Sequence, residues 1–436
     1  MKQQKPTTIK ELCEFIWYLE DKYDLLNFQI YDVKVWQYAR MRIYYFLAKK
    51  LNILKEPQVK LNTYNKISSV IQYIKNSFTA NPLFSKKSDI LILPHPRVKK
   101  IDNHYIDIYT YYLKEDLLKQ NYKVVEIESA YKGLHKREKD QDIYYDDFIR
   151  LMIKGIKLIP FYYQVHNSIV QEIEKDIAKI TGVKIDLQRE FSLFIKEYKV
   201  EAFFYKKILQ KVKPKQIYLS VSYGKGALIK VARELGIETI ELQHGTFSRY
   251  HLGYSFSCKK LDYFPDKFYV WSDFWKNLIP LPLDKQNIVI YEFAHMKNQL
   301  SKYKKKLKKP FQVVVLSQGA IGEEIARMIL KNIVYFKNFS IKYKLHPGEY
   351  ERWQEYPSLV QLVENYGVEL IKDCDLYELL STSSYQIGVF STAIYEGLEF
   401  GCKTILLNIT GIEYMQDILE QKRAFLYKEG TYLHEY

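Results

Sequence analysis

Hydrophobic and polar positions along this chain alternate with two periods, most regularly in the second half. Short apolar runs of strand type precede stretches in which apolar residues recur at helical spacing. Past residue 310 we expect strands at 312–316, 340–345, 368–371, 386–390 and 403–407, and helices at 323–331, 376–381 and 393–400. A strand–helix rhythm of this kind is typical of a doubly wound, Rossmann-like parallel sheet.

The first half follows the same rhythm less regularly. We expect strands at 89–94, 122–127, 215–221 and 238–242, helices at 109–119 and 227–235, and a largely helical region at 146–211. Residues 9–54 have helical spacing without a strand. Since 436 residues exceed what one core usually organises, the pattern predicts an α/β protein with an N-terminal helical appendage (1–60) and two Rossmann-like domains (61–260 and 261–436). The break should fall between about 255 and 265, and the C-terminal tail could pack back on the first domain.

Three short motifs stand at the ends of predicted strands. They are Gln243-His244-Gly245-Thr246, Lys344-Leu345-His346-Pro347, and Ser391-Thr392 with Glu396 one helical turn later. Ligands of open α/β sheets bind at the carboxyl ends of the strands, so two histidines in two such places suggest a cleft between two sheets.

In this order the motifs resemble those of the bacterial surface-polysaccharide transferases of the GT-B fold. That group includes capsule Kdo transferases, bacterial sialyl- and polysialyltransferases, and teichoic-acid glycerophosphotransferases. The resemblance covers about residues 215–410. It implies a GT-B-like fold, with the first domain on the acceptor side of a cleft and the second on the nucleotide-donor side.

The resemblance also implies an activity: a metal-independent glycosyltransferase that extends a bacterial cell-surface polysaccharide from a nucleotide-activated sugar, CMP-linked rather than UDP-linked. Two alternatives stay open. One is a teichoic-acid type transferase that moves a polyol phosphate from a CDP-linked donor, and the other, from a different class, is a basic nucleic-acid-binding protein. The acidic Glu/Asp-Asp-Gly motif that sialyltransferases use as the base is absent from the sequence, which leaves the base to be assigned.

On the donor side, His346 is expected to donate a hydrogen bond to the leaving phosphate, where negative charge develops. Pro347 ends the strand and fixes the turn, and Lys344 adds positive charge on the same strand face. The structural alternative is a histidine that caps a strand end by bonding to backbone.

Ser391 and Thr392 begin a predicted helix, where hydroxyls and free N–H groups favour phosphate, although an N-cap alone would explain them equally. Glu396 resembles the glutamate that in many GT-B enzymes holds the ribose hydroxyls. Ser317 follows the strand at 312–316 and is a weaker candidate for the same donor site.

On the acceptor side, His244 is the candidate general base, because imidazole titrates near neutrality. Gly245 permits close backbone approach, and Gln243 and Thr246 would orient the substrate or the histidine. An interdomain scaffold role is the alternative. His95-Pro96-Arg97 imitates the second motif and could bind an acidic acceptor or be a simple strand-end loop.

Two patterns in the sequence could suggest metal sites, and both have structural alternatives. Asp373-Cys374-Asp375 has a metal-binding spacing, but Asp375 is better placed to cap the helix that follows, so no catalytic metal and no cofactor are expected. The four cysteines (Cys13, Cys258, Cys374 and Cys402) include no CxxC pair, which argues against structural zinc and disulfides.

A net charge of +15 and 40 tyrosines admit a basic nucleic-acid-binding protein, the alternative of another class. However, the lysines are dispersed, and the one dense run, residues 301–309, reads as a solvated linker. We therefore expect no nucleic-acid partner. The expected partners are a nucleotide-sugar donor and a glycan or lipid-linked glycan acceptor, with an anionic membrane surface left open. Because no run of about 18 apolar residues and no secretory signal is evident, we expect a cytoplasmic protein, with peripheral contact at the inner membrane face also open.

Overall fold

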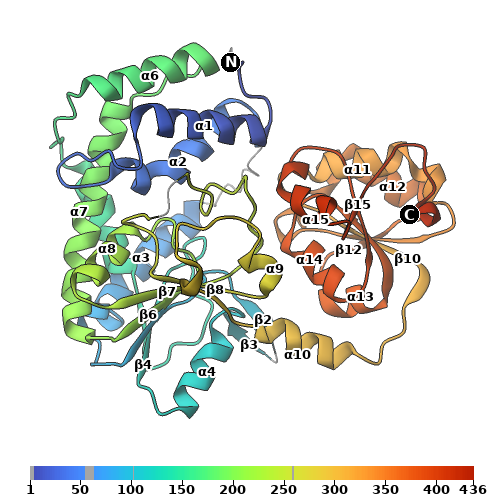
Figure 1. Ribbon diagram of the computed structural model, residues 1–436. Coiled ribbons are helices and arrows are strands. Elements are labelled where there is room, and N and C mark those ends of the chain that lie inside the picture. Colours follow the sequence, from blue (N-terminus) through green and yellow to red (C-terminus); the bar gives the residue numbers. More distant parts are fainter. Residues whose placement is uncertain (1–3, 55–62, 102, 258–259) are drawn as a thin grey trace.

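The computed structural model describes residues 4–54, 63–101, 103–257 and 260–436 of the chain. Two α/β domains lie side by side, each built on a parallel sheet, and helix α10 runs along one edge between them (Figure 1). This confirms the predicted fold class of two Rossmann-like domains.

The first sheet has the order β5-β4-β1-β6-β7-β8-β9, and every neighbouring pair is parallel. From β1 the chain goes to β4 on one side and later to β6 on the other, which makes the gap between β1 and β6 the switch point of the sheet. The strands are β1 (Ile90–Leu93), β4 (Val124–Glu128), β5 (Ile143–Tyr145), β6 (Gln216–Leu219), β7 (Glu238–Leu242), β8 (Lys267–Val270) and β9 (Ile288–Ile290), with a separate antiparallel hairpin of β2 (Lys99–Ile101) and β3 (His104–Ile106).

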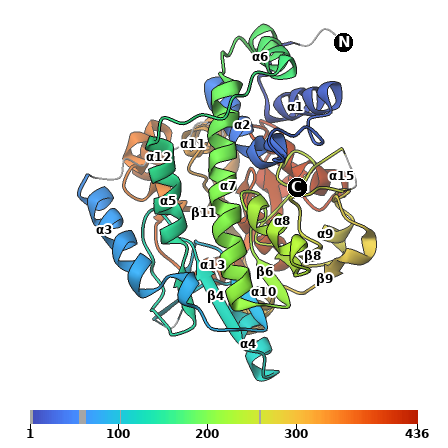
Figure 2. The ribbon, with the colours of Figure 1, turned by 90° about the vertical axis from the view of Figure 1, so that its left-hand side faces the viewer.

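The helices of the first domain surround this sheet. The long helix α7 crosses the domain and packs against α2, α5, α6 and α8 (Figure 2). The helices are α1 (Ile9–Tyr23), α2 (Val35–Lys50), α3 (Thr63–Thr79), α4 (Tyr111–Lys119), α5 (Asp147–Leu158), α6 (Ser168–Thr181), α7 (Leu187–Val212), α8 (Gly226–Glu234) and the short α9 (Asp273–Lys276).

Helices α1 and α2 form part of the first domain rather than the predicted appendage. Their buried residues belong to the same hydrophobic core as those of α6, α7 and β6. Arg40 of α2 pairs with Glu20 of α1 at 2.5 Å, both side chains being almost fully buried, and also donates to the carbonyl oxygen of Leu252. The Cys13 thiol reaches the carbonyl of Tyr250. The first two helices therefore support the segment that follows His244.

The second sheet has the order β12-β11-β10-β13-β14-β15, again all parallel. Its switch point lies between β10 and β13. The strands are β10 (Lys309–Leu316), β11 (Ser340–Lys344), β12 (Glu369–Ile371), β13 (Ser383–Gly388), β14 (Lys403–Leu406) and β15 (Phe425–Leu426), and the helices are α10 (Ala294–Tyr303), α11 (Gly322–Lys331), α12 (Pro357–Tyr366), α13 (Leu376–Thr382), α14 (Thr392–Glu399) and α15 (Gln416–Glu420). The predicted elements of this half are confirmed.

The change from one sheet to the other comes later than the predicted division at residue 260. Strands β8 and β9 follow that residue and extend the first sheet, with Leu242 of β7 paired to Tyr269 of β8. The irregular segment before β8 packs within the first domain, and the chain passes to the second domain after β9, through α10. The run at 301–309 is likewise more ordered than a solvated linker, because its first three residues complete α10 and its last begins β10.

Apolar side chains join the two domains. The ring of Trp275 on α9 lies 4.7 Å from that of Tyr395 on α14, and the Tyr44 and Tyr414 hydroxyls are 3.0 Å apart. The C-terminal tail packs on both domains. Asp417 of α15 lies 3.5 Å from Arg249 and Arg423 lies over the Phe274 ring, both in the first domain, whereas β15 pairs with β14 and Leu433 lies in the second core. None of the helices in the described part of the chain has the length and apolarity that crossing a bilayer requires.

Candidate active site

An open cavity of about 630 Å³ lies between the domains at the switch point of the second sheet. We call it the donor cavity. Its size falls within the range of sites that enclose a small molecule or cofactor. From the second domain it is lined by most of the residues predicted for a donor site, namely Ser317, Lys344, His346, Pro347 and Ser391. From the first domain and the connecting helix it is lined by Lys99, Lys100, His295 and Lys302.

His346 has both expected roles, since it caps a turn through its backbone contact and also lines the donor cavity. Its Nδ1 accepts the N–H of Gly348 at 3.1 Å and so caps the short turn after β11. Desolvation in the cleft, added to the positive charges of Arg97 and Lys344, lowers the pKa of His346 to about 4. The neutral ring therefore carries its proton on Nε2, and the cap leaves that N–H donor exposed to the cavity.

Lys344 supplies positive charge beside this donor. Its ammonium group donates to the carbonyl oxygens of Leu345 and Lys372, at 2.9 and 2.6 Å, and to the Tyr350 hydroxyl at 3.1 Å. No described carboxylate lies within ion-pair distance of it. Because its partners are neutral, the charge of Lys344 remains available to an anion in the cavity.

Glu349, which was not singled out in the sequence, fixes the His346 turn. It is fully buried, accepts the backbone N–H of His346 at 2.7 Å, and accepts the Ser317 hydroxyl at 3.0 Å. Ser317 thus ties the loop after β10 to the loop after β11. The spacing of His346 and Glu349 is that of a capping box, which is the signal that could have identified this carboxylate.

The Ser391-Thr392 motif begins α14, as predicted. The Ser391 hydroxyl accepts the N–H of Ala393 at 3.2 Å, and both lie at the donor cavity. Glu396 lies one turn further along and accepts the Tyr377 hydroxyl at 2.9 Å. Since Tyr377 and not Glu396 lines the cavity, a ligand would meet this glutamate only behind the tyrosine ring.

The turn that carries His244 meets this helix start across the cleft. A methyl group placed on Gly245 would lie 3.3 Å from the Thr392 hydroxyl oxygen, which is tighter than an ordinary contact. Glycine therefore lets the acceptor-side turn approach the donor-side helix closely. Burial is the main cause that lowers the pKa of His244 and of His346, and the charge of Arg97 contributes to both, for His244 after His95 and His251.

His244 is held by a hydrogen-bonded chain of buried groups. The Tyr254 hydroxyl donates to Glu241 at 2.5 Å and lies 3.3 Å from Nδ1 of His244. With its proton given to Glu241, the tyrosine oxygen accepts from Nδ1–H, which assigns the free electron pair of the imidazole to Nε2. Burial, followed by the charges of His95, His251 and Arg97, holds the pKa of His244 well below 6.5. The ring is neutral at physiological pH.

His95, which the sequence left open as an acceptor contact or part of a strand-end loop, lies directly against His244. The two rings stack with centroids 5.4 Å apart, and Tyr109 contacts both edge-on. Asp107 accepts the backbone N–H of His95 and holds the loop in place. The repeated His-Pro pair was the signal for this residue.

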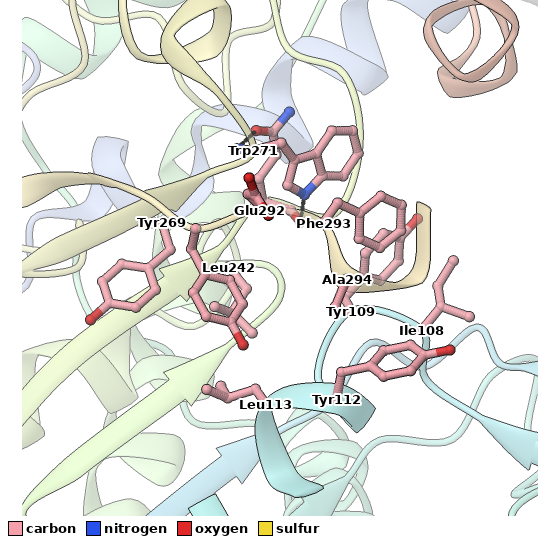
Figure 3. Close-up of a pocket in the computed structure, with 12 residues that line it drawn as sticks. Ile108, Tyr109, Tyr112, Leu113, Leu242, Tyr269, Trp271, Glu292, Phe293 and Ala294 are labelled. Carbon is pink, nitrogen blue, oxygen red and sulfur yellow. Dashed lines mark hydrogen bonds between the residues drawn. The ribbon is translucent and has the colours of Figure 1, made fainter. Parts of the chain in front are cut away.

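Gln243 positions the turn and does not face a ligand. Its amide donates to the carbonyl of Gly245 and accepts the backbone N–H of Trp271. Figure 3 shows the aromatic pocket beside it, in which Phe293 stacks between Trp271 and Tyr109 at 4.6 and 5.5 Å. This pocket has only about 10 Å³ of free volume, room for one water molecule, so it acts as packing behind the His244 turn.

Two further residues differ from expectation. Thr246 lines a separate, mostly apolar cavity of about 310 Å³ with Phe247, Phe390 and Tyr414 rather than the donor cavity. His295 of α10 was not predicted, yet it lines the donor cavity, and its buried Nε2 has no hydrogen-bond partner among the described residues. An unpartnered buried nitrogen at a cavity wall is a candidate ligand contact.

Asp375 caps α13 as predicted, accepting the N–H groups of Tyr377 and Glu378. It also accepts the Tyr303 hydroxyl at 2.5 Å and pairs with Lys302 at 3.5 Å, which attaches the connecting helix to the second domain. Within the described ranges, no group of three or more His, Cys, Asp or Glu side chains is placed to hold a metal ion.

No protein-family model matches the chain, and no functionally curated protein matches it either. Among solved structures, a UDP-GlcNAc 2-epimerase from Methanocaldococcus jannaschii is 11% identical with a TM-score of 0.45, over 78% of this chain and 88% of the epimerase. One from Neisseria meningitidis bound to UDP-GlcNAc is 12% identical with a TM-score of 0.44, over 77% and 86%. A glycosyltransferase from Rickettsia africae ESF-5 is 13% identical with a TM-score of 0.41, over 80% and 86%. Since these TM-scores lie below 0.5, the fold assignment rests on the strand order of the chain itself.

Proposed function

We propose that this protein is a glycosyltransferase that moves a sugar from a nucleotide-activated donor to a hydroxyl group of a glycan acceptor. The observation that carries the proposal is the donor cavity, where Lys344, His346 and Ser391 converge at the switch point of the second sheet while the His244 turn closes on the same helix start. Cation, neutral N–H donor and helix start are the groups that a diphosphate or phosphate leaving group requires.

On the donor side, cleavage of the glycosidic bond leaves negative charge on the phosphate. His346 and Lys344 both line the donor cavity, and neither side chain has a described carboxylate partner to give up when a phosphate binds. Preorganised donors stabilise developing charge without reorganisation, which is why they accelerate the reaction. Tyr377, whose hydroxyl is accepted by Glu396 from behind, is the group proposed to meet the ribose.

On the acceptor side, Nε2 of His244 takes the proton of the attacking hydroxyl. Tyr254 holds the reactive tautomer by accepting from Nδ1, and Glu241 in turn holds Tyr254. Burial raises the pKa of Glu241 to about 8, so this carboxyl group is mostly protonated at neutral pH and supports Tyr254 as a neutral hydrogen-bond acceptor. No metal and no cofactor takes part in this scheme.

The test is a panel of nucleotides measured by thermal shift, with CMP, CDP and UDP beside a single-stranded oligonucleotide. A ligand at about 100 times its dissociation constant stabilises a protein by about 2.7 kcal/mol, which such a measurement resolves. We expect CMP to stabilise the protein more than UDP and the Lys344→Ala variant to lose the effect. Stabilisation by the oligonucleotide alone would replace the proposal with nucleic-acid binding.

A CDP-linked polyol donor would use the same residues, and product analysis separates the two reactions. Transfer of a sugar leaves the nucleotide with all its phosphates, whereas transfer of a polyol phosphate releases CMP from a CDP-linked donor. Phosphorus in the acceptor product would identify the second reaction. The assignment to a bacterial cell-surface polysaccharide is part of the proposal and depends on the acceptor found.

We further propose peripheral contact with an anionic membrane. Helix α3 turns its apolar stripe of Val70, Ile74 and Phe78 outward, while its polar Asn76 is buried against Asp147. The exposed side chains of Leu158, Ile159 and Phe161 follow the end of α5, which packs on α3 (Figure 2). All charged residues in 68–88 are lysines (Lys75, Lys86 and Lys87). An apolar stripe with lysines in the same segment complements an anionic lipid surface.

A further inference from the structure

A second cavity, of about 500 Å³, lies at the switch point of the first sheet, between the loops that follow β1 and β6. Pro94 and Pro96, which flank His95, line one part of it together with Tyr223. The Tyr223 ring is 6.3 Å from that of His244, so this cavity is a close neighbour of the proposed base. We call it the charged cavity, because helices α2, α5 and α7 add ionisable side chains to its wall.

Two carboxylates in this wall are each shared by two cations. Glu197 lies 2.6 Å from both Arg42 and Lys157. Each carboxylate neutralises one of its two partners, so this group retains a positive charge.

The second group repeats this arrangement deeper in the cavity. Asp146 lies 2.7 Å from Arg150 and 3.6 Å from Lys225. The Lys225 side chain is only 22% exposed, and its ammonium is otherwise near the hydroxyls of Ser129 and Tyr205 at 3.5 Å. Holding excess positive charge in such a place is costly unless an anion or water compensates it.

The remaining ionisable groups do not remove the excess. Lys154 is a fifth cation in the wall, 5.2 Å from the Tyr73 ring, and Glu201 is the third carboxylate. Burial raises the pKa of Glu201 to about 7, so it is only partly ionised at neutral pH. Five cations face at most three carboxylates, and at least two positive charges are left for a ligand.

We propose that the charged cavity binds an anionic group of the acceptor, a carboxylate or a phosphate, close to the hydroxyl that receives the sugar. The inference rests on the proposed function in so far as the anion belongs to an acceptor. The donor has its own cavity in the other domain, and the charged cavity lies at the corresponding switch point on the His244 side. The anion has two possible sources: the carboxylate of an acidic sugar, or a phosphate that links the glycan to a carrier.

The experiment titrates the full-length protein calorimetrically with three probes: an oligogalacturonate, inorganic pyrophosphate and an uncharged maltooligosaccharide of similar length to the first. Arg150→Gln is the main variant, because Asp146 keeps Lys225 as a partner. Lys157→Gln is the second, because Glu197 keeps Arg42. Lys331→Gln, which removes an exposed lysine paired with Glu429 on the second domain, is the matched control.

We expect at least one anionic probe to bind about tenfold more weakly to each cavity variant than to the wild type, because each variant loses one charge-assisted hydrogen bond. The same probe should bind the control variant as well as it binds the wild type. Preference for the oligogalacturonate would identify an acidic sugar, and preference for pyrophosphate a phosphate-bearing carrier. Equal binding to wild type and both variants, or equal binding of the uncharged oligosaccharide, would overturn the inference. Nucleotide titration of the same proteins keeps the two proposals separate: anion binding without any nucleotide binding would refute the glycosyltransferase and leave the anion site standing.

Discussion

At the scale of single residues, the site depends on histidines that stay neutral. Hydrogen bonds to Nδ1 select the tautomer of each: Gly348 donates to His346, whereas His244 donates to Tyr254. The two rings consequently offer opposite groups at Nε2, a donor in His346 and an acceptor in His244. One imidazole suits a leaving phosphate and the other suits an attacking hydroxyl.

Replacing His346 tests the donor role. His346→Ala should lower kcat by about 10²–10³, the usual cost of a lost donor to developing charge, with a smaller effect on the melting temperature. Steady-state kinetics with the donor found in the nucleotide panel measures this. His346→Asn can still accept the Gly348 N–H and so controls for the cap, and His434→Ala removes an exposed histidine elsewhere. Full turnover in the Asn variant would mean that the cap, not the Nε2 donor, is what matters.

Replacing His244 tests the base. A base must be neutral to accept a proton, so protonation at acid pH abolishes the rate, and a pKa held below 6.5 moves that loss to more acid pH than an ordinary histidine would give. His244→Ala should remove most activity together with the acid limb of the kcat/KM profile, while nucleotide affinity survives in the other domain.

The Tyr254→Phe variant separates the base from its support. It keeps His244 but removes the acceptor for Nδ1–H, and the loss of one such hydrogen bond should slow turnover about tenfold. An acid limb that persists in the residual rate of His244→Ala would assign the base to another residue. A collapse of nucleotide affinity in that variant would place His244 in the donor site instead.

At the scale of elements, a buried histidine connects three parts of the first domain. His135 Nδ1 lies 2.7 Å from Glu128 at the end of β4, and Nε2 lies 3.1 Å from Asp147 at the start of α5, which also accepts from Asn76 of α3. Burial lowers the pKa of His135, but the hydrogen bonds to Asp147 and Glu128 outweigh it and raise the pKa to about 9.

This shift predicts how stability depends on pH. Because the folded-state pKa lies above the unfolded value of about 6.5, the contribution, about 3 kcal/mol at most, is fully present below that value and is lost as pH rises through 9. Melting temperatures between pH 6.5 and 9.5 should therefore fall more steeply in the wild type than in His135→Gln. His166→Gln is the control. Parallel curves for His135→Gln and the wild type would show that the cluster is not charged as described.

The sequence predicted those helices and strands whose own residues show a clear hydrophobic period. The strands before His244 and His346 and the helix after Ser391 are long enough to show their period, and the structure confirms them. Strands β8 and β9 are short and follow an irregular segment, so their period could not be seen in the sequence. The predicted domain boundary at residue 260 therefore fell before the last two strands of the first sheet. The contacts of His95 with His244 and of Thr392 with Gly245 depend on how loops from distant strands converge, which no local pattern encodes.

At the scale of the whole molecule, the two domains repeat one design. Each sheet has its cavity at its switch point, and the two cavities differ in chemistry. One holds Lys344 without a carboxylate partner beside the neutral His346, and the other holds paired charges with a positive excess. The His244 turn lies between them. A donor and an acceptor held at the two switch points would thus meet at this turn, which the aromatic packing of Figure 3 supports from behind.

The outward apolar stripe of α3 predicts how the whole protein meets a surface. Phe78 is 76% exposed, and transferring a phenylalanine side chain out of water is worth about 1.5–3 kcal/mol. Phe78→Ser should therefore weaken binding to phosphatidylglycerol vesicles at least about tenfold in a co-sedimentation assay. Phe311→Ser is the matched control, because this phenylalanine is 63% exposed on the second domain.

Lipid composition and salt complete the test. Binding should be much weaker to phosphatidylcholine vesicles and should fall as ionic strength rises, because the lysines at 75, 86 and 87 act through a screened field. Equal sedimentation of wild type and Phe78→Ser would contradict the membrane proposal. If Phe78→Ser instead abolished a concentration-dependent dimer of the free protein, the stripe would be covered by a second copy of the chain, and the acceptor would have to reach the His244 turn from solution.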